Sequence, residues 1–152
     1  LLVTPIQVAV AYGAIATGAM EQLASNAGIA VMLVPFASSI VLVMGSPETD
    51  PAQPRALIGG HLVSTLSGFL LLWAAGPVWW AAALAAGLAI TAMHLTKTFH
   101  PPAGVDPLIV VTGALPFKFM LVPVASGAAL LALFAFVWHN STQRGSWPRR
   151  WW

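Results

Sequence analysis

Residues 99–109 read FHPPAGVDPLI and interrupt an otherwise apolar chain, in which only 7% of residues are charged. Pro101 and Pro102 have no backbone N–H, and the residue before a proline is disfavoured in helical geometry, so a helix should end here. His100 and Asp106 flank the break. Ionisable side chains are rare within a bilayer unless they face the interior of a helix bundle. The stretch therefore predicts a helix start inside a bundle, beside titratable groups.

The composition places the whole chain in a membrane. Of its 152 residues 59% are hydrophobic, and the mean hydropathy is +0.85. A soluble domain of this size does not need so many apolar residues to build its core. Cysteine is absent from the sequence, which excludes disulfides, thiolate catalysis and Cys-ligated metal centres. We predict an all-α fold, that of a polytopic helical membrane protein.

Six apolar segments are separated by glycine, proline and charge. Two of them are unusual. The segment 27–45 is interrupted by Pro35, and the segment 103–115, which follows Pro101-Pro102, has only 13 residues. A full span needs roughly 20 helical residues. We therefore predict four full transmembrane helices plus two broken or short membrane helices. The full spans are 3–20, 56–75, 78–96 and 119–138, and the broken segments are 27–45 and 103–115.

The two broken segments resemble each other. PFASSIVLVMG begins at Pro35 and PAGVDPLIVVTG begins at Pro102, and each ends at a glycine. One interpretation is an inverted repeat, with copies over 1–75 and 76–140. The other is that any two apolar segments between proline and glycine look alike. In either case we expect a single transmembrane domain over 1–140, followed by a basic, Trp-rich tail over 141–152.

The basic residues predict an orientation, because Lys and Arg concentrate on the cytoplasmic side of a membrane. If all six segments cross, five basic residues fall on one side and only Lys118 on the other. If the broken segments enter and leave by one face, the division is three against three. We favour six crossings with both termini cytoplasmic, in a bacterial inner membrane. The tail is expected to be an interfacial anchor rather than a nucleic-acid site. The five residues are Arg55, Lys97, Arg144, Arg149 and Arg150, and the anchor tryptophans are Trp147, Trp151 and Trp152.

Small residues recur at four-residue spacing in three of the spans. Such ladders let helix backbones approach closely in lipid. We interpret them as packing faces rather than as pore lining. They are Ala9-Gly13-Thr17, Gly60-Ser64-Gly68 and Ala83-Gly87-Thr91.

The helix starts after Pro35 and Pro102 are the predicted binding elements for a small anion. A helix start offers unpaired N–H groups and the positive end of the helix dipole. The expected donors are Ser38, Ser39 and the amides of Ala103 and Gly104, although capping alone would also explain these residues.

Titratable groups complete the candidate site. His100 is predicted to be functional, whereas His61 is either a substrate contact or proton relay, or a neutral imidazole bonded within the core. Asp106 lies in the first turn of its helix, where it serves as a cap or as a selectivity element. Arg55 is expected to be a basic gate at a cytoplasmic mouth. The other two histidines, His94 and His139, are expected to be structural or interfacial.

Enzyme chemistry is not indicated by the sequence. The order and spacing of Ser, His and Asp predict no hydrolytic triad, and neither a phosphate loop nor a carboxylate pair is found. The histidine spacings also do not match a metal-ligand pattern. We expect no catalytic residues, no metal and no cofactor.

Three motifs in order, VPFASSIVLVMG at 34–45, AQPRALIGGHL at 52–62 and HPPAG at 100–104, resemble the HPP family of integral membrane proteins. The resemblance implies about four transmembrane helices and, from plant and cyanobacterial members, a role in nitrite transport. It implies that five residues have a structural role in the family motifs: Pro35, Gly59, Gly60, Pro101 and Pro102. The wider family pattern also includes Phe36, Gln53, Pro54, Arg55, His61, His100, Ala103 and Gly104.

The chain departs from the family pattern at several positions. It has Ala37-Ser38-Ser39 where Gly-Ala-Ser is typical, and Ala56 where Asn is common. It also has Val105-Asp106-Pro107 where small residues and Thr are usual. A negative charge at Asp106 would repel an anion unless it were protonated or paired, and Lys97 is the expected partner.

These observations lead to one main functional prediction and one rival. The main one is a transporter or channel for a small monovalent anion, nitrite-like, that passes between two opposed broken helices. The rival is an accessory subunit of a larger membrane complex without transport activity. The expected partners are the lipid bilayer, the anion, and either further copies of the chain or other membrane subunits.

Overall fold

The computed structural model describes residues 33–142 and 144–151, together with the single positions 14, 15, 18 and 22. The predicted first span, 3–20, lies outside the described residues except at positions 14, 15 and 18. Within the described ranges all regular structure is helical, as predicted, and strands are absent there.

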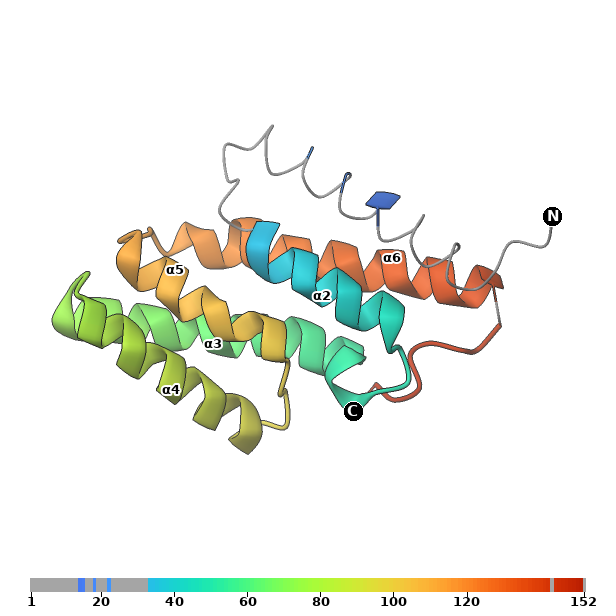
Figure 1. The fold of residues 1–152 in the computed structure, drawn as a ribbon, viewed down its shortest axis with the longest axis horizontal. Coiled ribbons are helices and arrows are strands. Elements are labelled where there is room, and N and C mark those ends of the chain that lie inside the picture. Colours follow the sequence, from blue (N-terminus) through green and yellow to red (C-terminus); the bar gives the residue numbers. More distant parts are fainter. Residues whose placement is uncertain (1–13, 16–17, 19–21, 23–32, 143, 152) are drawn as a thin grey trace.

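Five α-helices and three short helical turns follow one another along the described chain (Figure 1). Helix α3 is central and packs against α4, α5 and α6, and α2 packs against α6. The α-helices are α2 (Leu33–Gly45), α3 (Pro54–Ala75), α4 (Trp79–Leu95), α5 (Asp106–Thr112) and α6 (Ser126–Thr142). The short turns are η2 (Asp50–Ala52), η3 (Pro101–Val105) and η4 (Met120–Ala125).

Local sequence explains where α3 and α4 end. Gly76 stands after α3 with φ 79°, a left-handed conformation that glycine adopts without strain, and its amide donates to Leu72 O. Pro77 follows, so the helix cannot continue. At the other end of α4, Lys97 has φ 56° and turns the chain into an extended run that leads to His100. Two antiparallel helices thus deliver the HPP motif to the side of α3.

The prediction of four full transmembrane helices is not supported by the described residues. Among the residues that the structure describes, Pro54–Ala75 and Met120–Thr142 are the helices long and apolar enough to cross a membrane. The predicted span 78–96 forms α4, which has 17 residues, because the Gly76-Pro77 turn and the break at Lys97 shorten it. At about 1.5 Å per residue, α4 is roughly 26 Å long.

The last predicted span, 119–138, is continuous but not straight. Val122 leaves helical geometry (φ −132°, ψ 112°) directly before Pro123, which lies inside the π-helical turn η4. Proline removes a ladder donor and clashes with the preceding turn, so a kink is expected there. The predicted broken segment 103–115 contains most of η3 and the seven-residue α5.

The tail does not form the predicted anchor at Trp147. This side chain is 2% exposed, and its indole N–H donates to Ala52 O at 3.2 Å. Trp151, by contrast, is 57% exposed. Gln53 also binds the tail, since its side-chain oxygen accepts from the backbone N–H of Arg149 at 2.8 Å. Trp147 is therefore part of the core, and the tail folds back onto the loop before α3.

The packing interpretation is confirmed for the ladder on α3. A Cβ on Gly60 would lie 2.6 Å from His100 Cβ, and one on Gly68 would lie 2.8 Å from Pro107 Cα. Between them Ser64 Oγ donates to Ala103 O at 2.6 Å. The ladder Ala83-Gly87-Thr91 is exposed on α4, and Ala9-Gly13-Thr17 lies outside the described residues.

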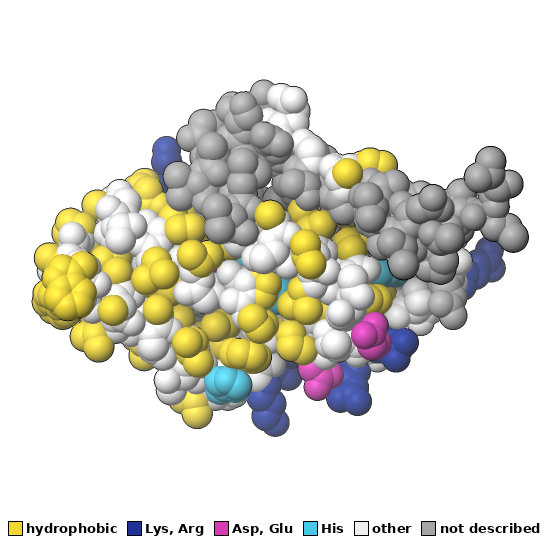
Figure 2. Space-filling view, viewed as in Figure 1, with side chains coloured by type: hydrophobic (Ala, Val, Ile, Leu, Met, Phe, Trp, Pro, Cys, Tyr) yellow, Lys and Arg dark blue, Asp and Glu magenta, His cyan; other side chains and the backbone are white. Residues whose placement is uncertain are grey.

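The two ends of the molecule differ in chemistry. Exposed aromatic side chains gather where α3 ends and α4 begins, whereas charged side chains gather near the start of α3 (Figure 2). Arg55 and Trp73 are 18 positions apart on α3, which corresponds to roughly 27 Å, close to the hydrocarbon thickness of a bilayer. The exposed aromatic residues of that end are Trp73, Trp79, Trp80 and Phe117.

Candidate functional site

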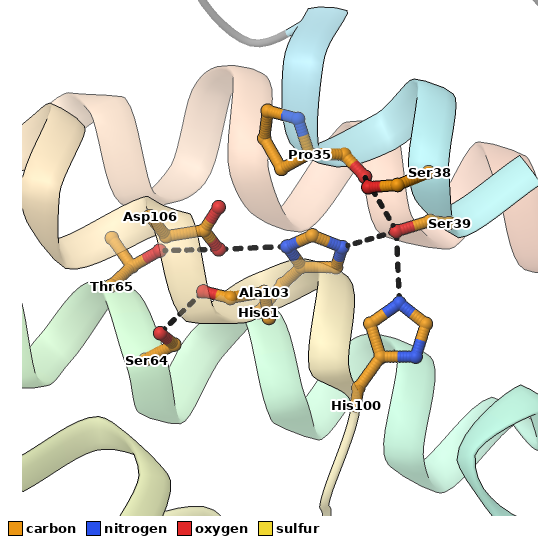
Figure 3. Close-up of polar contacts among 9 residues, drawn as sticks. All are labelled: Pro35, Ser38, Ser39, His61, Ser64, Thr65, His100, Ala103 and Asp106. Atoms are coloured by element: carbon orange, nitrogen blue, oxygen red, sulfur yellow. Dashed lines mark hydrogen bonds and ion pairs between the residues drawn. The ribbon is translucent and has the colours of Figure 1, made fainter. Parts of the chain in front are cut away.

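Ser39 of α2 is the centre of a hydrogen-bonded group of side chains (Figure 3). Its Oγ lies 3.0 Å from His61 Nε2 of α3 and 2.8 Å from His100 Nε2, and it also lies 2.8 Å from Pro35 O. Three segments far apart in sequence therefore meet at one hydroxyl group. The helix start at Pro35 and the HPP break come together here.

The group extends in both directions from the serine. On one side His61 Nδ1 lies 2.7 Å from Asp106 Oδ2, to which Thr65 Oγ1 also donates at 3.4 Å. On the other side His100 Nδ1 donates to Pro51 O at 2.7 Å. We call the side chains of Ser39, His61, His100 and Asp106 the buried polar network, because each is 0% exposed.

Glycines of α3 and the prolines of the HPP motif position this network. Gly59 and Gly60 have no side chains, so the segment from Thr98 to His100 can lie directly against the helix. His100 then has extended backbone geometry (φ −132°, ψ 96°) before Pro101, as expected for a residue that precedes proline. Its ring therefore leaves the α4–η3 connection and points toward α2.

The network pairs nearly all its buried polar atoms. The His61–Asp106 contact is an ion pair if the imidazole is protonated, and both side chains are fully buried. Removing one partner from such a pair typically costs about 3–5 kcal/mol, because the other is left unpaired in a low dielectric. Asp106 Oδ1 is the exception: among the described residues it is buried without a hydrogen-bond partner.

Asp106, His61 and Ser39 have the contacts of a Ser–His–Asp triad, which sequence spacing did not predict. In a hydrolase the serine must be reachable by substrate. Here Ser39 is completely buried and bonds a second imidazole as well. The arrangement is therefore suited to holding and passing protons rather than to presenting a nucleophile. The described residues contain no group of three or more His, Cys, Asp or Glu arranged to hold a metal ion.

Other predicted site residues lie outside the network. Ser38 is exposed and donates to Pro35 O at 2.9 Å. The amide of Ala103 donates to His100 O at 3.0 Å, so it is engaged within η3 and does not face an anion as predicted. Gly104 is partly exposed, and a Cβ there would meet no atom within 4 Å. Of the four predicted donors, only Ser39 reaches the titratable groups.

The predicted pairing of Asp106 with Lys97 is wrong. His61 is the partner of Asp106, and Lys97 is an exposed residue at the charged end of the molecule. Lys97 stands just beyond α4, whereas Asp106 follows the η3 turn, which carries the chain back into the bundle. Lys97 and Asp106 are only nine residues apart in sequence, so their separation in the structure could not be predicted from their spacing.

A basic pocket lies beside the start of α3. Its volume is about 300 Å³, and its charged residues are Arg55, Lys97, Arg150 and Asp50. We call these four residues the basic mouth. Arg55 Nη2 donates to Thr96 O at 2.7 Å, which places it at the mouth and not in the network. A second pocket of about 420 Å³ is lined by Asp50, Lys97 and also Pro51.

Pro51 was not singled out from the sequence, because only its carbonyl takes part. That carbonyl accepts from His100, and the residue also lines the second pocket. Pro51 therefore connects the network to the second pocket.

With this geometry established, comparison with known proteins is decisive for the family. The family model described as HPP, transmembrane region, matches residues 3–148, nearly the whole chain. The chain belongs to the HPP family. The sequence resemblance is thus confirmed, and with it the assignment as a membrane protein.

Two similar proteins come from Dictyostelium discoideum, and both are called transmembrane proteins. One is 40% identical over 129 residues, which cover 80% of this chain and 42% of the relative. The other is 37% identical over 137 residues, which cover 85% of this chain and 48% of the relative. The chain thus spans less than half the length of these relatives. No solved structure matches this HPP chain.

Proposed function

We propose that this HPP protein transports a small monovalent anion, nitrite-like in size and charge, across the membrane. The observation that best supports this proposal is the buried polar network, which contains three ionisable side chains at 0% exposure. Placing ionisable groups among membrane helices is costly, and proteins that do so usually use them along a path for ions or substrates.

The basic mouth supports an anion rather than a cation as the substrate. It has three cationic side chains and one carboxylate, and Arg150 lies 3.6 Å from that carboxylate, Asp50. A cleft lined by an excess of positive charge raises the local concentration of anions. His100, beneath Pro51, would be the first titratable group on the way inward.

Asp106 does not oppose this proposal. Its carboxyl is bonded to His61, which Ser39 links to His100. One additional proton on either imidazole or on the carboxyl balances the negative charge, so an anion does not meet an isolated carboxylate.

The test is anion flux in proteoliposomes made with the full chain. We expect uptake of at least one of nitrite, nitrate, formate and chloride above the rate in protein-free liposomes. Replacing both Arg55 and Lys97 by Gln should slow uptake by about tenfold, because the mouth would concentrate the anion less. The matched control replaces Arg144 and Lys118 by Gln, which removes the same charge from exposed positions outside the mouth and should leave the rate nearly unchanged.

One observation favours the second candidate, an accessory subunit of a larger membrane complex. The ladder Ala83-Gly87-Thr91 is a helix-packing pattern, yet it is exposed on α4. Absence of flux for all four anions would contradict transport and leave this role.

A further inference from the structure

The two contacts of Ser39 with histidine require more protons than its own hydroxyl supplies. Ser39 Oγ lies 3.0 Å from His61 Nε2 and 2.8 Å from His100 Nε2. Each contact needs one proton between the two atoms, and a serine hydroxyl carries only one. At least one of the two imidazoles must therefore carry a proton on Nε2.

The outer bond of His100 fixes a second proton. Pro51 O can only accept, so His100 Nδ1 must be protonated to make its bond of 2.7 Å. If His100 also donates from Nε2 to Ser39, the ring carries both protons and is an imidazolium.

The inner bond of His61 can be made in two ways. Its Nδ1 lies 2.7 Å from Asp106 Oδ2, and the proton between them resides either on the ring or on the carboxyl. The ring protonated at Nδ1 leaves Nε2 free to accept from Ser39. If the proton is instead on Asp106 Oδ2, His61 Nδ1 accepts it in the hydrogen bond, and the ring carries its proton on Nε2 and donates it to Ser39.

Counting protons over the four contacts that join these side chains and Pro51 O gives the charge of the network when all four are hydrogen bonds. The four contacts, from Pro51 O through His100, Ser39 and His61 to Asp106, need four protons. The hydroxyl and two neutral imidazoles supply three, so one more is required, and with it the network has zero net charge. Pro35 O, 2.8 Å from Ser39 Oγ, also accepts from this hydroxyl, but Ser38 Oγ donates to the same carbonyl at 2.9 Å, so Pro35 O stays paired when the Ser39 hydroxyl turns to a histidine.

We infer that the buried polar network holds one exchangeable proton and couples anion transport to proton movement; this inference rests on the proposed function. In the first arrangement His100 is an imidazolium that donates to Ser39, Ser39 donates to His61 Nε2, and His61 Nδ1–H donates to the Asp106 carboxylate. In the second, each of these three protons has moved across its own contact. His100 is then neutral, Ser39 donates back to it, His61 donates to Ser39, and Asp106 is protonated.

The two arrangements have the same number of protons and the same four hydrogen bonds, so the shift leaves no contact unpaired. It moves one positive charge away from Pro51, which lines the second pocket together with Asp50 and Lys97 of the basic mouth, toward Asp106 beside Thr65. Thr65 lies 11 residues beyond the start of α3, roughly 16 Å along the helix. Asp106 Oδ1, buried without a hydrogen-bond partner among the described residues, lies at the inner end of the network.

Other described titratable groups on the surrounding elements are engaged elsewhere. His94 of α4 stacks on Phe99, and His139 of α6 lies 3.0 Å from Val43 O. Asp50 of η2 lies 3.6 Å from Arg150 at the surface. The proton count therefore depends on the four network residues.

The test measures uptake driven by a pH gradient alone. Proteoliposomes with equal nitrite inside and outside should accumulate nitrite when a pH gradient is imposed, and an internal pH dye should report proton movement beyond that of protein-free liposomes. Ser39→Ala removes both histidine contacts and should reduce this uptake by about a hundredfold. Asp106→Asn can still accept from His61 but cannot hold a proton, and it should have the same effect.

The control is Ser67→Ala, which should keep the uptake within about twofold. Ser67 is also buried and donates to a carbonyl four residues earlier, Val63 O, but it is not part of the network. Nitrite exchange that ignores the pH gradient in the unmodified protein would overturn the coupling and leave the proposed function intact. Coupled uptake that survives in Ser39→Ala would overturn the role of the network.

A second measurement covers the case in which none of the four anions is transported, so that the proposed function itself fails. Nitrogen-15 NMR of the histidine-labelled chain should show His61 and His100 titrating as a coupled pair, and titrating separately in Ser39→Ala. Independent titration in both proteins would overturn the shared proton.

Discussion

Gly60 shows how a single missing side chain sets the geometry of the network. It faces the segment that carries His100, with Thr98 O only 2.8 Å and His100 Cβ 2.6 Å from the place where a Cβ would stand. The close approach of this segment to α3 brings the two histidine rings to a centroid distance of 5.1 Å. A ring held further away could not share Ser39 with His61.

Gly60→Ala should therefore destabilise the protein and disconnect His100. The added methyl group must displace backbone, and overpacking of this kind typically costs about 1–3 kcal/mol. We expect a lower Tm in detergent and loss of anion uptake. Gly87→Ala is the matched control, because a Cβ at Gly87 meets no atom within 4 Å and alanine stabilises a helix interior by up to about 1 kcal/mol. Equal Tm values for the two variants would contradict the packing role of Gly60.

The residue-scale predictions from the sequence succeeded where they depended on local chemistry. Prolines predicted the break, and the small-residue ladder Gly60-Ser64-Gly68 predicted close packing on α3. The joining of Ser39, His61 and Asp106 could not be predicted, because these residues are 22 and 45 positions apart and meet only when three elements pack. The sequence also could not distinguish Ser38 from Ser39, since one position of rotation on α2 decides which hydroxyl faces inward.

At the scale of elements, hydropathy alone overestimated the number of full spans. Average hydropathy carries no information about backbone conformation, and Gly76 and Lys97 adopt left-handed conformations at the two ends of α4. It also missed the kink before Pro123, since Phe119 through Trp138 reads as one apolar run. The tail was misjudged for a related reason: tryptophan beside arginine is typical of an interface, but Trp147 has a tertiary partner in Ala52.

Trp147→Ala tests whether the tail is part of the fold. The side chain is almost fully buried and bonds Ala52 O, so its removal should cost about 3–5 kcal/mol, as is typical of buried tryptophan. Trp151→Ala removes an exposed tryptophan from the same tail and should change the free energy of unfolding by no more than about 0.5 kcal/mol. Thermal unfolding in detergent measures both variants, and similar losses of Tm would show that the tail is not docked through Trp147.

At the scale of the whole molecule, the two ends of α3 match the two faces of a bilayer. The charged end has the basic mouth, while the opposite end has Trp73, Trp79 and Trp80 exposed. Tryptophan is enriched where hydrocarbon meets headgroups, and positive charge is enriched on the cytoplasmic side. The buried polar network lies between the two ends, nearer to the mouth.

Cysteine labelling tests this placement directly, because the chain has no cysteine of its own. Glu48, Arg144 and Lys118 are exposed, and the first two belong to segments at the end that holds the basic mouth. Lys118 lies in the turn before η4, next to Phe117 of the aromatic end. A membrane-impermeant maleimide should therefore label Glu48→Cys and Arg144→Cys from one side and Lys118→Cys only from the other. By the positive-inside rule the first side should be the cytoplasm. If Glu48→Cys and Lys118→Cys label from the same side, α3 does not cross the bilayer and the basic mouth cannot open a path through it.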